Sequence, residues 1–471
     1  MTTRTSGRAD IEHEPQAPPP HPFAVLDELA SYHDSPAEPM NVHVELWPPG
    51  HLDPRRLAEA VATLLAGEPR ARARRAAGGW WRRGYTWEFP AEADLDPVST
   101  TTWQTAKELD EIRVRFLSTA PPVDSSPPFR LLLARGPERD SLILNASHVA
   151  LDGRSCLRLL QSIAGQYSTG QYSADQYSAD QYSGFGTPGP PPGPVRGNSA
   201  RQAPEPAPPD NQVERSARRS ARIARQHAAD RMRRREQRRA PGYGVAMLAW
   251  PGVPSTPHGT VNDLLIAALI QTVARWNAAR HRPPRPVRIS MPLDIRPPGG
   301  EDELGNLSRL CAVTAAADGD DLTAAVAVQT RRAKRETGPR EDPALAALAG
   351  TPLPASVKRR LVRLAMHSVG RLRCDTSLLS NLGNVTDPPR FGPLVPERIW
   401  FSTSAHMPRG LSVGAVTVAG RLQLCFRYRY ALLDDAAADE FVAEYARALS
   451  ELSELSEQAE LARPAEPRTA T

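Results

Sequence analysis

Residues 165–240 divide the chain into two halves, because this stretch has no pattern from which a hydrophobic core could be built. It begins with Gln-Tyr-Ser repeated four times at a five-residue period, continues through a segment rich in Pro and Gly, and ends in a run of arginines. Such a short repeat without an apolar face is typical of a low-complexity linker, and Pro- and Gly-rich segments stay extended. The chain of 471 residues is also too long for one ordinary core. We therefore expect two domains joined by a low-complexity and Arg-rich linker.

Both halves mix strand and helix signals. Residues 41–47 alternate between apolar and polar side chains as a half-buried strand does, and residues 129–147 predict two strands around a Gly-Pro turn. In the second half, residues 261–276 place apolar side chains on one helical face, with Thr260 as the expected N-cap. The mixture predicts two α/β lobes. We expect a first lobe at residues 22–164 and a second at 241–460, with disordered termini at 1–21 and 461–471.

The basic character of the chain comes from one tract. Between Arg215 and Arg239, eleven arginines stand against two acids, so this tract carries +9 and leaves about −4 of the total charge of +5 for the rest. Clustered arginine binds phosphate groups without sequence preference. The tract has no interleaved aromatic residues and no recognised DNA-binding pattern, so we expect a solvated linker and no specific nucleic-acid partner. A binder of anionic polymers or membrane surfaces stays open as an alternative.

Several kinds of site lack their motifs. The four cysteines, at positions 156, 311, 374 and 425, form no CxxC pair, which argues against a structural zinc site and a disulfide framework. HExxH and P-loop patterns are absent, and GxGxxG occurs only as Gly184-Phe-Gly186-Thr-Pro-Gly189 in the Pro- and Gly-rich segment, without the strand and helix signals that a dinucleotide site requires. Metal, nucleoside triphosphate and dinucleotide chemistry therefore have no support. The first residues lack the apolar core of a signal peptide, and no apolar run reaches 18 residues. We expect a cytoplasmic protein without a membrane span.

The sharpest local pattern is Asn-Ala-Ser-His-Val-Ala-Leu-Asp-Gly-Arg at residues 145–154. His148 follows an apolar strand run, and an imidazole can serve as a general base near neutral pH. Asp152 is placed to cap the helix that follows, and Gly153 permits a backbone conformation that a side chain forbids. The alternative is a buried, hydrogen-bonded histidine beside an ordinary helix cap. These ten residues alone leave both interpretations open.

A second pattern, Gly410-Leu-Ser412-Val-Gly414, matches the GxSxG nucleophile elbow in letters only. That elbow requires a strand before it, a helix after it and a histidine later in the chain. Here strand patterns follow, and no histidine occurs after His406. We therefore exclude a serine hydrolase.

The HxxxDG pattern after a strand resembles the HHxxxDG signature of the condensation-domain and CoA-dependent acyltransferase superfamily, which includes nonribosomal peptide condensation domains, wax ester synthases and chloramphenicol acetyltransferase. Four other segments agree in order: the opening from residue 22, which resembles wax ester synthase-like acyltransferases, then TVNDLLIAAL, MPLDIRP with LGN, and SNLGNV. The resemblance covers most of residues 22–455 apart from the linker. It implies an α/β fold of two chloramphenicol acetyltransferase-like lobes that form a pseudo-dimer with a central tunnel.

The resemblance also implies roles for single residues. His148 would deprotonate or orient an amine or hydroxyl that attacks a thioester carbonyl. Asp152 would point away from the substrate and pair with an arginine of the second lobe, for which Arg296 in MPLDIRP is the candidate; a surface arginine is the alternative. Ser147 stands where the family has the first of two histidines, which leaves the site geometry open. Ser147 and Asn381, the first asparagine of SNLGNV, are candidates for the tunnel wall.

These residues together predict a wax ester synthase-like or free-standing condensation-like acyltransferase. His148 would be catalytic, and Asp152, Gly153 and Arg296 would be structural parts of its site. We expect the donor to be acyl-CoA or a phosphopantetheine-linked acyl group on a carrier protein, with no bound cofactor or metal. The acceptor would be an alcohol or amine, giving an ester or amide in specialised metabolism or lipid ester synthesis. Ser147 keeps open a repurposed or non-catalytic condensation-fold protein, such as a cyclase or a scaffold.

Overall fold

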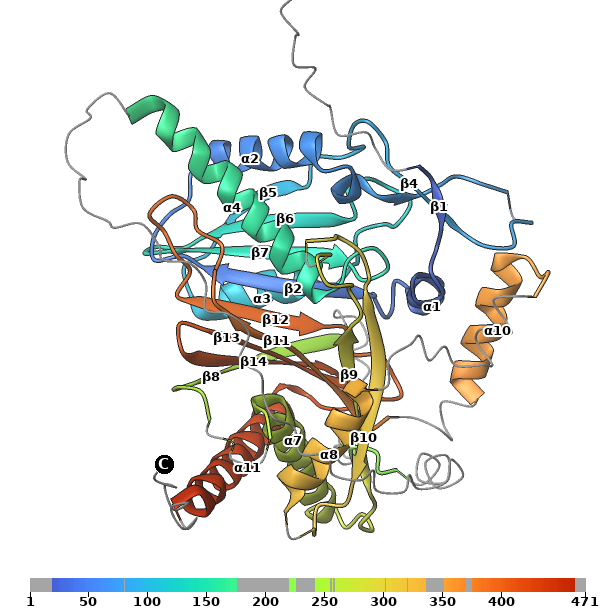
Figure 1. Ribbon diagram of the computed structural model, residues 1–471, viewed down its shortest axis with the longest axis vertical. Helices are drawn as coiled ribbons and strands as arrows, with labels where there is room; N and C mark the ends of the chain where they lie inside the picture. Colours follow the sequence, from blue (N-terminus) through green and yellow to red (C-terminus); the bar gives the residue numbers. More distant parts are fainter. Residues whose placement is uncertain are drawn as a thin grey trace, which may run out of the picture.

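The protein consists of two lobes, each with a β-sheet whose outer face is covered by helices (Figure 1). The computed structural model describes residues 19–175, 220–225, 242–335, 351–368 and 375–461, apart from positions 80, 255, 257, 258, 301 and 320. The predicted α/β class with two lobes is confirmed. The disorder predicted for the two termini falls outside the described residues, except at residues 19–21 and 461, and so does most of the predicted linker.

The first lobe is built on a five-stranded sheet in the order β12-β2-β7-β6-β5. Helices α2 and α4 pack against the face formed by the alternate apolar residues of β2, all of them fully buried. Helix α2 starts where Asp53 accepts hydrogen bonds from the N–H groups of Arg55 and Arg56, with Pro54 in its first turn. The elements of this lobe, apart from β12, are α1 (Val25–His33), β2 (Asn41–Trp47), α2 (Pro54–Gly67), β5 (Val98–Thr102), α3 (Ala106–Phe116), β6 (Phe129–Arg135), β7 (Asp140–Ser147) and α4 (Gly153–Asp175).

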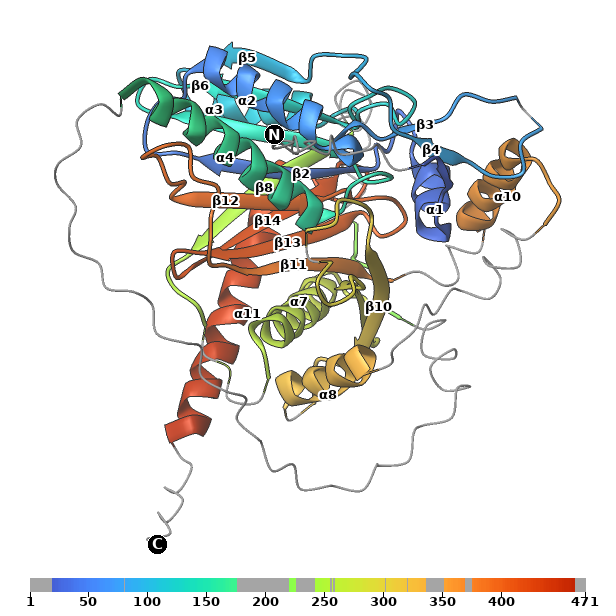
Figure 2. The same ribbon diagram turned by 45° about the horizontal axis from the view of Figure 1, so that its top comes forward.

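A small sheet in the order β1-β4-β3 lies at one edge of the first lobe. Its elements are β1 (His21–Pro22), the 3-10 helix η1 (Pro69–Arg72), β3 (Arg74–Arg75) and β4 (Thr86–Glu88). Phe23 stacks on Trp87 at this edge, with ring centroids 4.1 Å apart. Helix α10 (Ala355–Ser368) from the second half of the chain lies beside α1 on the same side (Figure 2).

The second lobe has a six-stranded sheet in the order β10-β9-β11-β13-β14-β8. Helix α7 contacts both α8 and α11 (Figure 2), and its residues from Leu264 to Ile270 are therefore all buried. Asp263 accepts hydrogen bonds from the N–H and the hydroxyl of Thr260, as expected for the start of this helix. The elements are β8 (Tyr243–Trp250), α7 (Val261–Ala278), β9 (Val287–Asp294), β10 (Ser308–Ala315), α8 (Leu322–Arg335), β11 (Ser377–Val385), β12 (Arg398–Thr403), β13 (Leu411–Val418), β14 (Arg421–Arg429) and α11 (Asp435–Leu461).

Strand β12 crosses between the lobes. It follows β11 in the chain but pairs antiparallel with β2 in the sheet of the first lobe. The crossing is close, because a Cβ atom at Gly414 would lie 1.9 Å from the carbonyl oxygen of Phe401. Ser412 donates a hydrogen bond of 2.8 Å to the carbonyl of Thr403. The GxSxG pattern thus belongs to the junction of the lobes, and residues 241–460 do not form a lobe by themselves.

The predicted linker is shorter than residues 165–240. Helix α4 continues through the first Gln-Tyr-Ser repeats to Asp175, and Tyr167 is buried against Phe391. Within the arginine tract, residues 220–225 dock on the second lobe, where the N–H of Ala224 donates to Asn277 and Trp276 donates to the carbonyl of Ala224. Apolar side chains explain both features, since Tyr167 is buried against the first lobe, and Ala221, Ile223 and Ala224 are buried against the second.

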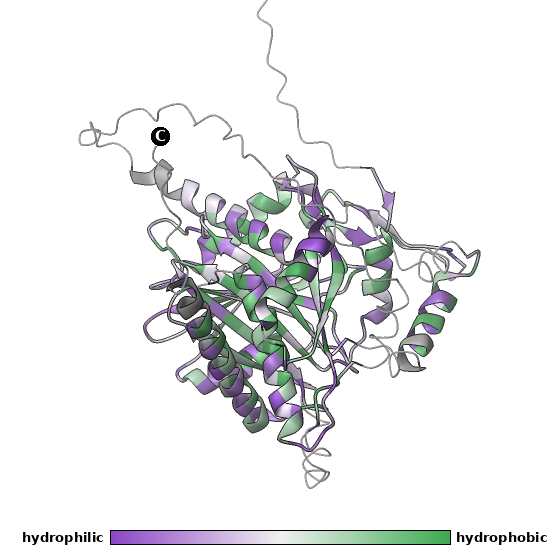
Figure 3. Ribbon diagram, turned by 60° about the horizontal axis from the view of Figure 1, so that its bottom comes forward, coloured by the Kyte–Doolittle hydropathy of each residue, from purple (hydrophilic) through white to green (hydrophobic). Residues whose placement is uncertain are grey.

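The hydropathy of the chain follows this architecture. In Figure 3 the strands in the interior are largely hydrophobic, whereas the surrounding helices alternate between hydrophobic and hydrophilic residues. In the part of the chain that the structure describes, no helix has both the length and the apolar composition needed to span a membrane.

Candidate active site

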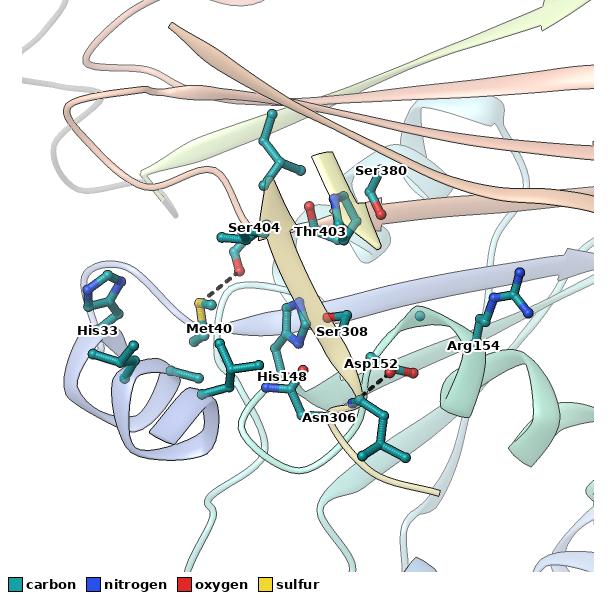
Figure 4. Close-up of a pocket in the computed structure, with 18 of the residues that line it drawn as sticks. His33, Met40, His148, Asp152, Arg154, Asn306, Ser308, Ser380, Thr403 and Ser404 are labelled. Carbon is teal, nitrogen blue, oxygen red and sulfur yellow. Dashed lines mark hydrogen bonds between the residues drawn. The ribbon is translucent and has the colours of Figure 1, made fainter. Parts of the chain in front are cut away.

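A pocket of about 330 Å³ lies between the lobes, next to the HxxxDG segment (Figure 4). Its first-lobe wall comes from α1, Met40 and the loop between β7 and α4. Its second-lobe wall comes from β9, the start of β10, β11 and the connection from β12 to β13. A site in this pocket therefore requires both lobes.

His148 lies in the pocket, on the tight turn that follows β7. The turn is formed by hydrogen bonds from the N–H groups of Ala150 and Leu151 to the carbonyl of Ser147, and the N–H of His148 donates to the carbonyl of Met40. The imidazole is half-buried, and its Nδ1 atom is enclosed by the turn, next to the backbone of His148 and Leu151. Nε2 is thus the nitrogen that faces the pocket.

The surroundings of His148 favour a neutral imidazole. Burial lowers the pKa of His148, and the negative charge of Asp152 opposes this shift without cancelling it. A neutral ring has a free lone pair at one nitrogen, which a general base requires.

Asp152 and Arg296 come together across the lobe boundary. The two guanidinium nitrogens Nη1 and Nη2 of Arg296 each donate a hydrogen bond of 3.0 Å to one carboxylate oxygen of Asp152. Both side chains are almost fully buried, with 3% of Arg296 and 6% of Asp152 exposed. Burial acts to lower the pKa of Arg296, but the hydrogen bonds and charge of Asp152 outweigh it and leave this pKa raised. The surface arginine considered as an alternative is therefore excluded.

Every acceptor and donor around this ion pair is occupied. Asp152 also accepts hydrogen bonds from the N–H groups of Ser155 and Leu307, at 2.8 and 2.9 Å. Arg296 donates further to Ser155 and to the carbonyl of Glu303. The carboxylate thus caps α4 and fastens the loop between β9 and β10 to the first lobe, so its role is to position the two walls of the pocket.

Gly153 is required for a different reason from the predicted one. The expectation of an unusual backbone conformation is wrong, since its φ lies outside the left-handed region. A Cβ atom here would instead lie 2.7 Å from the ring of Phe401 and 2.8 Å from Leu382. Glycine allows the start of α4 to approach the strands β12 and β11 closely.

The two predicted tunnel residues separate in the structure. Asn381 lines the pocket at a bulge, where the register between β11 and β13 shifts and Gly383 has a φ of +81°. Ser147 is buried to 99% and is absent from the pocket wall, so its assignment to the tunnel wall is wrong. Its hydroxyl has no hydrogen-bond partner in the described part of the chain.

Several pocket residues were not predicted from the sequence. Asn306 belongs to the LGN segment and Ser308 follows it, so this signal was available. Arg154, Asp294 and Ser380 likewise belong to the segments 145–154, MPLDIRP and SNLGNV. No local pattern distinguishes the remaining polar residues of the wall, which come from distant parts of the chain: His33, Thr403, Ser404, His406 and Arg409.

The arrangement of sheets and helices is the condensation-domain fold. The first condensation domain of the CDA synthetase superposes with a TM-score of 0.58 at 15% identity, over 93% of this chain and 97% of that one. The starter condensation domain of rhizomide synthetase RzmA, a mutant in complex with C8-CoA and Leu-SNAC, gives a TM-score of 0.55 at 13% identity and covers 92% of both chains. The epimerization domain from the third module of tyrocidine synthetase B gives 0.54 at 12% identity, over 93% of this chain and 98% of that one.

The chain is also similar in sequence to two proteins of Mycobacterium tuberculosis. They are uncharacterized protein MT2362 of strain CDC 1551 / Oshkosh and uncharacterized protein Rv2305 of strain ATCC 25618 / H37Rv. Each is 29% identical over 446 residues, which cover 91% of this chain and 98% of the relative. No protein-family model matches the chain.

Proposed function

We propose that the protein is an acyltransferase that moves an acyl group from a CoA or carrier-protein thioester to an alcohol or amine. The observation that carries this proposal is the half-buried imidazole of His148, held between two lobes in a pocket that both lobes line. The condensation-domain fold supports it, because a pocket between lobes suits a long, thin phosphopantetheine arm. We assign the product to specialised metabolism or lipid ester synthesis.

In the proposed reaction, the acceptor nitrogen or oxygen attacks the thioester carbonyl while Nε2 of His148 takes its proton. The carbonyl oxygen becomes negative in the tetrahedral intermediate, and hydrogen-bond donors placed around it stabilise this charge. Ser308, Ser380 and Asn381 carry donors and line the same pocket. When the intermediate collapses, the carbon–sulfur bond breaks, and the thiolate recovers the proton from His148. The ester or amide and a free thiol remain.

The choice of an acyl-CoA donor draws on one structural neighbour. The RzmA starter condensation domain was solved with C8-CoA and Leu-SNAC. We infer that this chain uses a thioester of the same kind, with either an amine or a hydroxyl as the acceptor.

The proposal is tested by mixing the protein with a panel of acyl-CoAs, carrier-bound acyl groups, amines and alcohols, and by measuring thiol release and product mass. We expect products with wild type and none with His148→Gln, which removes the base and keeps the size of the side chain. The matched control is His281→Asn, an exposed histidine outside the pocket, which should turn over like wild type. Ester products would favour the wax ester synthase-like alternative, and amide products would favour the condensation-like one.

A second candidate is a repurposed member of the fold, either non-catalytic or specialised for another reaction. Two observations favour it: Ser147 replaces the first histidine of the motif, and an epimerization domain shares the fold. Equal product formation by wild type and His148→Gln, or none by either across the panel, would support this candidate against acyl transfer.

A further inference from the structure

The end of the pocket beside α1 carries a group of basic side chains that the proposed reaction does not use. His33 at the end of α1, and His406 and Arg409 in the connection between β12 and β13, all line the pocket. The rings of His33 and His406 lie 6.3 Å apart. In the view of Figure 4, His33 and Arg154 lie on opposite sides of His148. We call His33, His406 and Arg409 the basic end of the pocket.

Arg409 meets no charged partner among the residues that the structure describes. Its Nη1 atom is buried, yet the described residues offer it neither a hydrogen bond nor a carboxylate within ion-pair distance. Arg296, in the same pocket wall, meets a carboxylate through both terminal nitrogens. A guanidinium that is taken from water without an acceptor is unfavourable, and carboxylates and phosphates are the groups that its fork of donors matches.

The imidazoles of His33 and His406 lie among positively charged arginines, which disfavour their protonation. Burial, and then the charges of Arg409 and Arg363, lower the pKa of His33 to about 4. The pKa of His406 lies well below its usual range through burial, His33 and Arg409, with Arg429 and Arg427 adding to the shift. Both imidazoles are therefore neutral near pH 7 and do not add to the charge of Arg409.

Glu38 accepts a hydrogen bond from the loop that carries His406 and Arg409, but its carboxylate faces Met407 and Arg429. Its Oε1 atom accepts the N–H of Met407 at 3.0 Å and lies 3.8 Å from Nε of Arg429. The hydroxyl of Thr403, also in the pocket wall, is buried and lacks a partner within the described ranges. Unpartnered polar atoms of this kind are unfavourable in the folded protein, and hydrogen bonds to a polar ligand would offset their cost.

The loop that carries His406 and Arg409 is fixed in place before any ligand arrives. Ser404 accepts the N–H of Asn41 at 3.2 Å, and a ring nitrogen of His406 lies 3.3 Å from the carbonyl of Pro39. The N–H of Gly410 closes the turn on the carbonyl of His406 at 2.9 Å. A prearranged donor set binds without paying the entropy of loop ordering.

We propose that Arg409, flanked by His33 and His406, binds an anionic oxygen group, a carboxylate or a phosphate, on the substrate whose reacting atom lies at His148. The inference rests on the proposed function, since that substrate is one of the two partners in acyl transfer. The anion has two sources: the carboxylate of an amino or hydroxy acid acceptor, or the phosphate of the donor's pantetheine arm. In both cases the protein selects against neutral analogues of that partner.

Binding of two matched pairs of probes tests the proposal. Leucine and leucinamide differ in the carboxylate of the acceptor, and octanoyl-phosphopantetheine and octanoyl-pantetheine differ only in the phosphate of the donor. Calorimetric titration gives the Kd of each probe for wild type, Arg409→Gln and Arg409→Lys. The control is Arg285→Gln, an exposed arginine outside the pocket.

We expect Arg409→Gln to weaken one anionic probe by about 10- to 100-fold, the effect of losing a charged hydrogen bond, and to leave its neutral partner within about twofold. Arg409→Lys should recover part of the loss, because it keeps the charge without the fork. The pair that responds identifies the source of the anion. Equal effects on both members of each pair, no effect on any probe, or no binding of any probe by wild type would overturn the proposal.

These outcomes are distinguishable from failure of the proposed function. Selective loss of anion binding without any product formation would uphold the basic end as an anion site and count against acyl transfer. If product formation requires His148 and Arg409→Gln changes the Kd of none of the four probes, the result would support acyl transfer and count against an anion site at the basic end.

Discussion

The two ends of the pocket differ in whether their arginine is paired with a carboxylate among the described residues. At one end, Arg296 is paired in bidentate fashion with Asp152. Arg296 donates a further hydrogen bond to Ser155, and Asp152 accepts one from the N–H of Leu307. At the other end, Arg409 has a buried nitrogen that no described residue satisfies. Both arginines belong to the second half of the chain and both line the same pocket. We infer from this difference that Arg296 holds the walls of the site in place, whereas Arg409 is available to a ligand.

The largest difference between the two ends is expected in stability. Asp152→Asn or Arg296→Gln leaves an almost fully buried charge without its partner, which costs about 3–5 kcal/mol of folding free energy. Arg409→Gln breaks no hydrogen bond to a described residue and removes a buried unpartnered nitrogen, so it should leave stability unchanged or raise it by up to about 1 kcal/mol. Urea unfolding followed by tryptophan fluorescence measures both. Similar stabilities of the Arg296 and Arg409 variants would remove the distinction between the two ends.

A smaller effect is expected at Gly153, where the start of α4 approaches β12 and β11 closely. Gly153→Ala forces a Cβ atom against Phe401 and Leu382 and should destabilise the protein by about 1–3 kcal/mol. The matched control is Gly165→Ala in the same helix, where an added Cβ atom would meet nothing within 4 Å outside the helix backbone. That change should stabilise the protein by up to about 1 kcal/mol, because alanine is the better helix former. Thermal unfolding of the two variants in parallel is decisive, since equal shifts would contradict the close approach.

The smallest effect is expected at Ser147, whose unpartnered hydroxyl lies outside the pocket. Ser147→Ala removes a buried polar atom that gains no hydrogen bond from the described residues, so it should be neutral or stabilise by up to about 1 kcal/mol. The Kd values for acyl-CoA and acceptor should not change. A loss of stability, or weaker substrate binding, would show that the hydroxyl has a partner and that position 147 contributes to the site.

Local sequence patterns predicted several helices and strands, and together with the family resemblance they predicted the pair of Asp152 and Arg296. The apolar spacing after Asp152 predicted α4, and the resemblance placed Arg296 opposite Asp152. These features are encoded within a few residues of each other or in a short motif. The strand β12 is different: it pairs with β2, more than 350 residues earlier in the chain, and no periodicity specifies a partner at that distance.

The basic end of the pocket was missed for the same reason. His33 lies in the first lobe, whereas His406 and Arg409 lie in a loop beyond β12, and only the crossing of that strand brings them together. The extent of the linker was also misjudged. Composition predicted disorder from residue 165, but Tyr167 finds a buried position against Phe391 and extends the helix. Tertiary contacts outweighed low-complexity composition at this point.

The pH dependence of kcat/KM for acyl transfer tests the central claim, that a neutral His148 is the base, most directly. Because burial holds the pKa of His148 below its ordinary value of 6.5, kcat/KM of wild type with an alcohol acceptor, which does not titrate in this range, should fall in acidic solution with a midpoint below pH 6.5 and stay constant around neutral pH. His148→Gln should lower kcat/KM by about 10²- to 10⁴-fold and lose this acidic limb. An activity limb near or above pH 7 in wild type, or the same profile and rate in His148→Gln, would contradict the account.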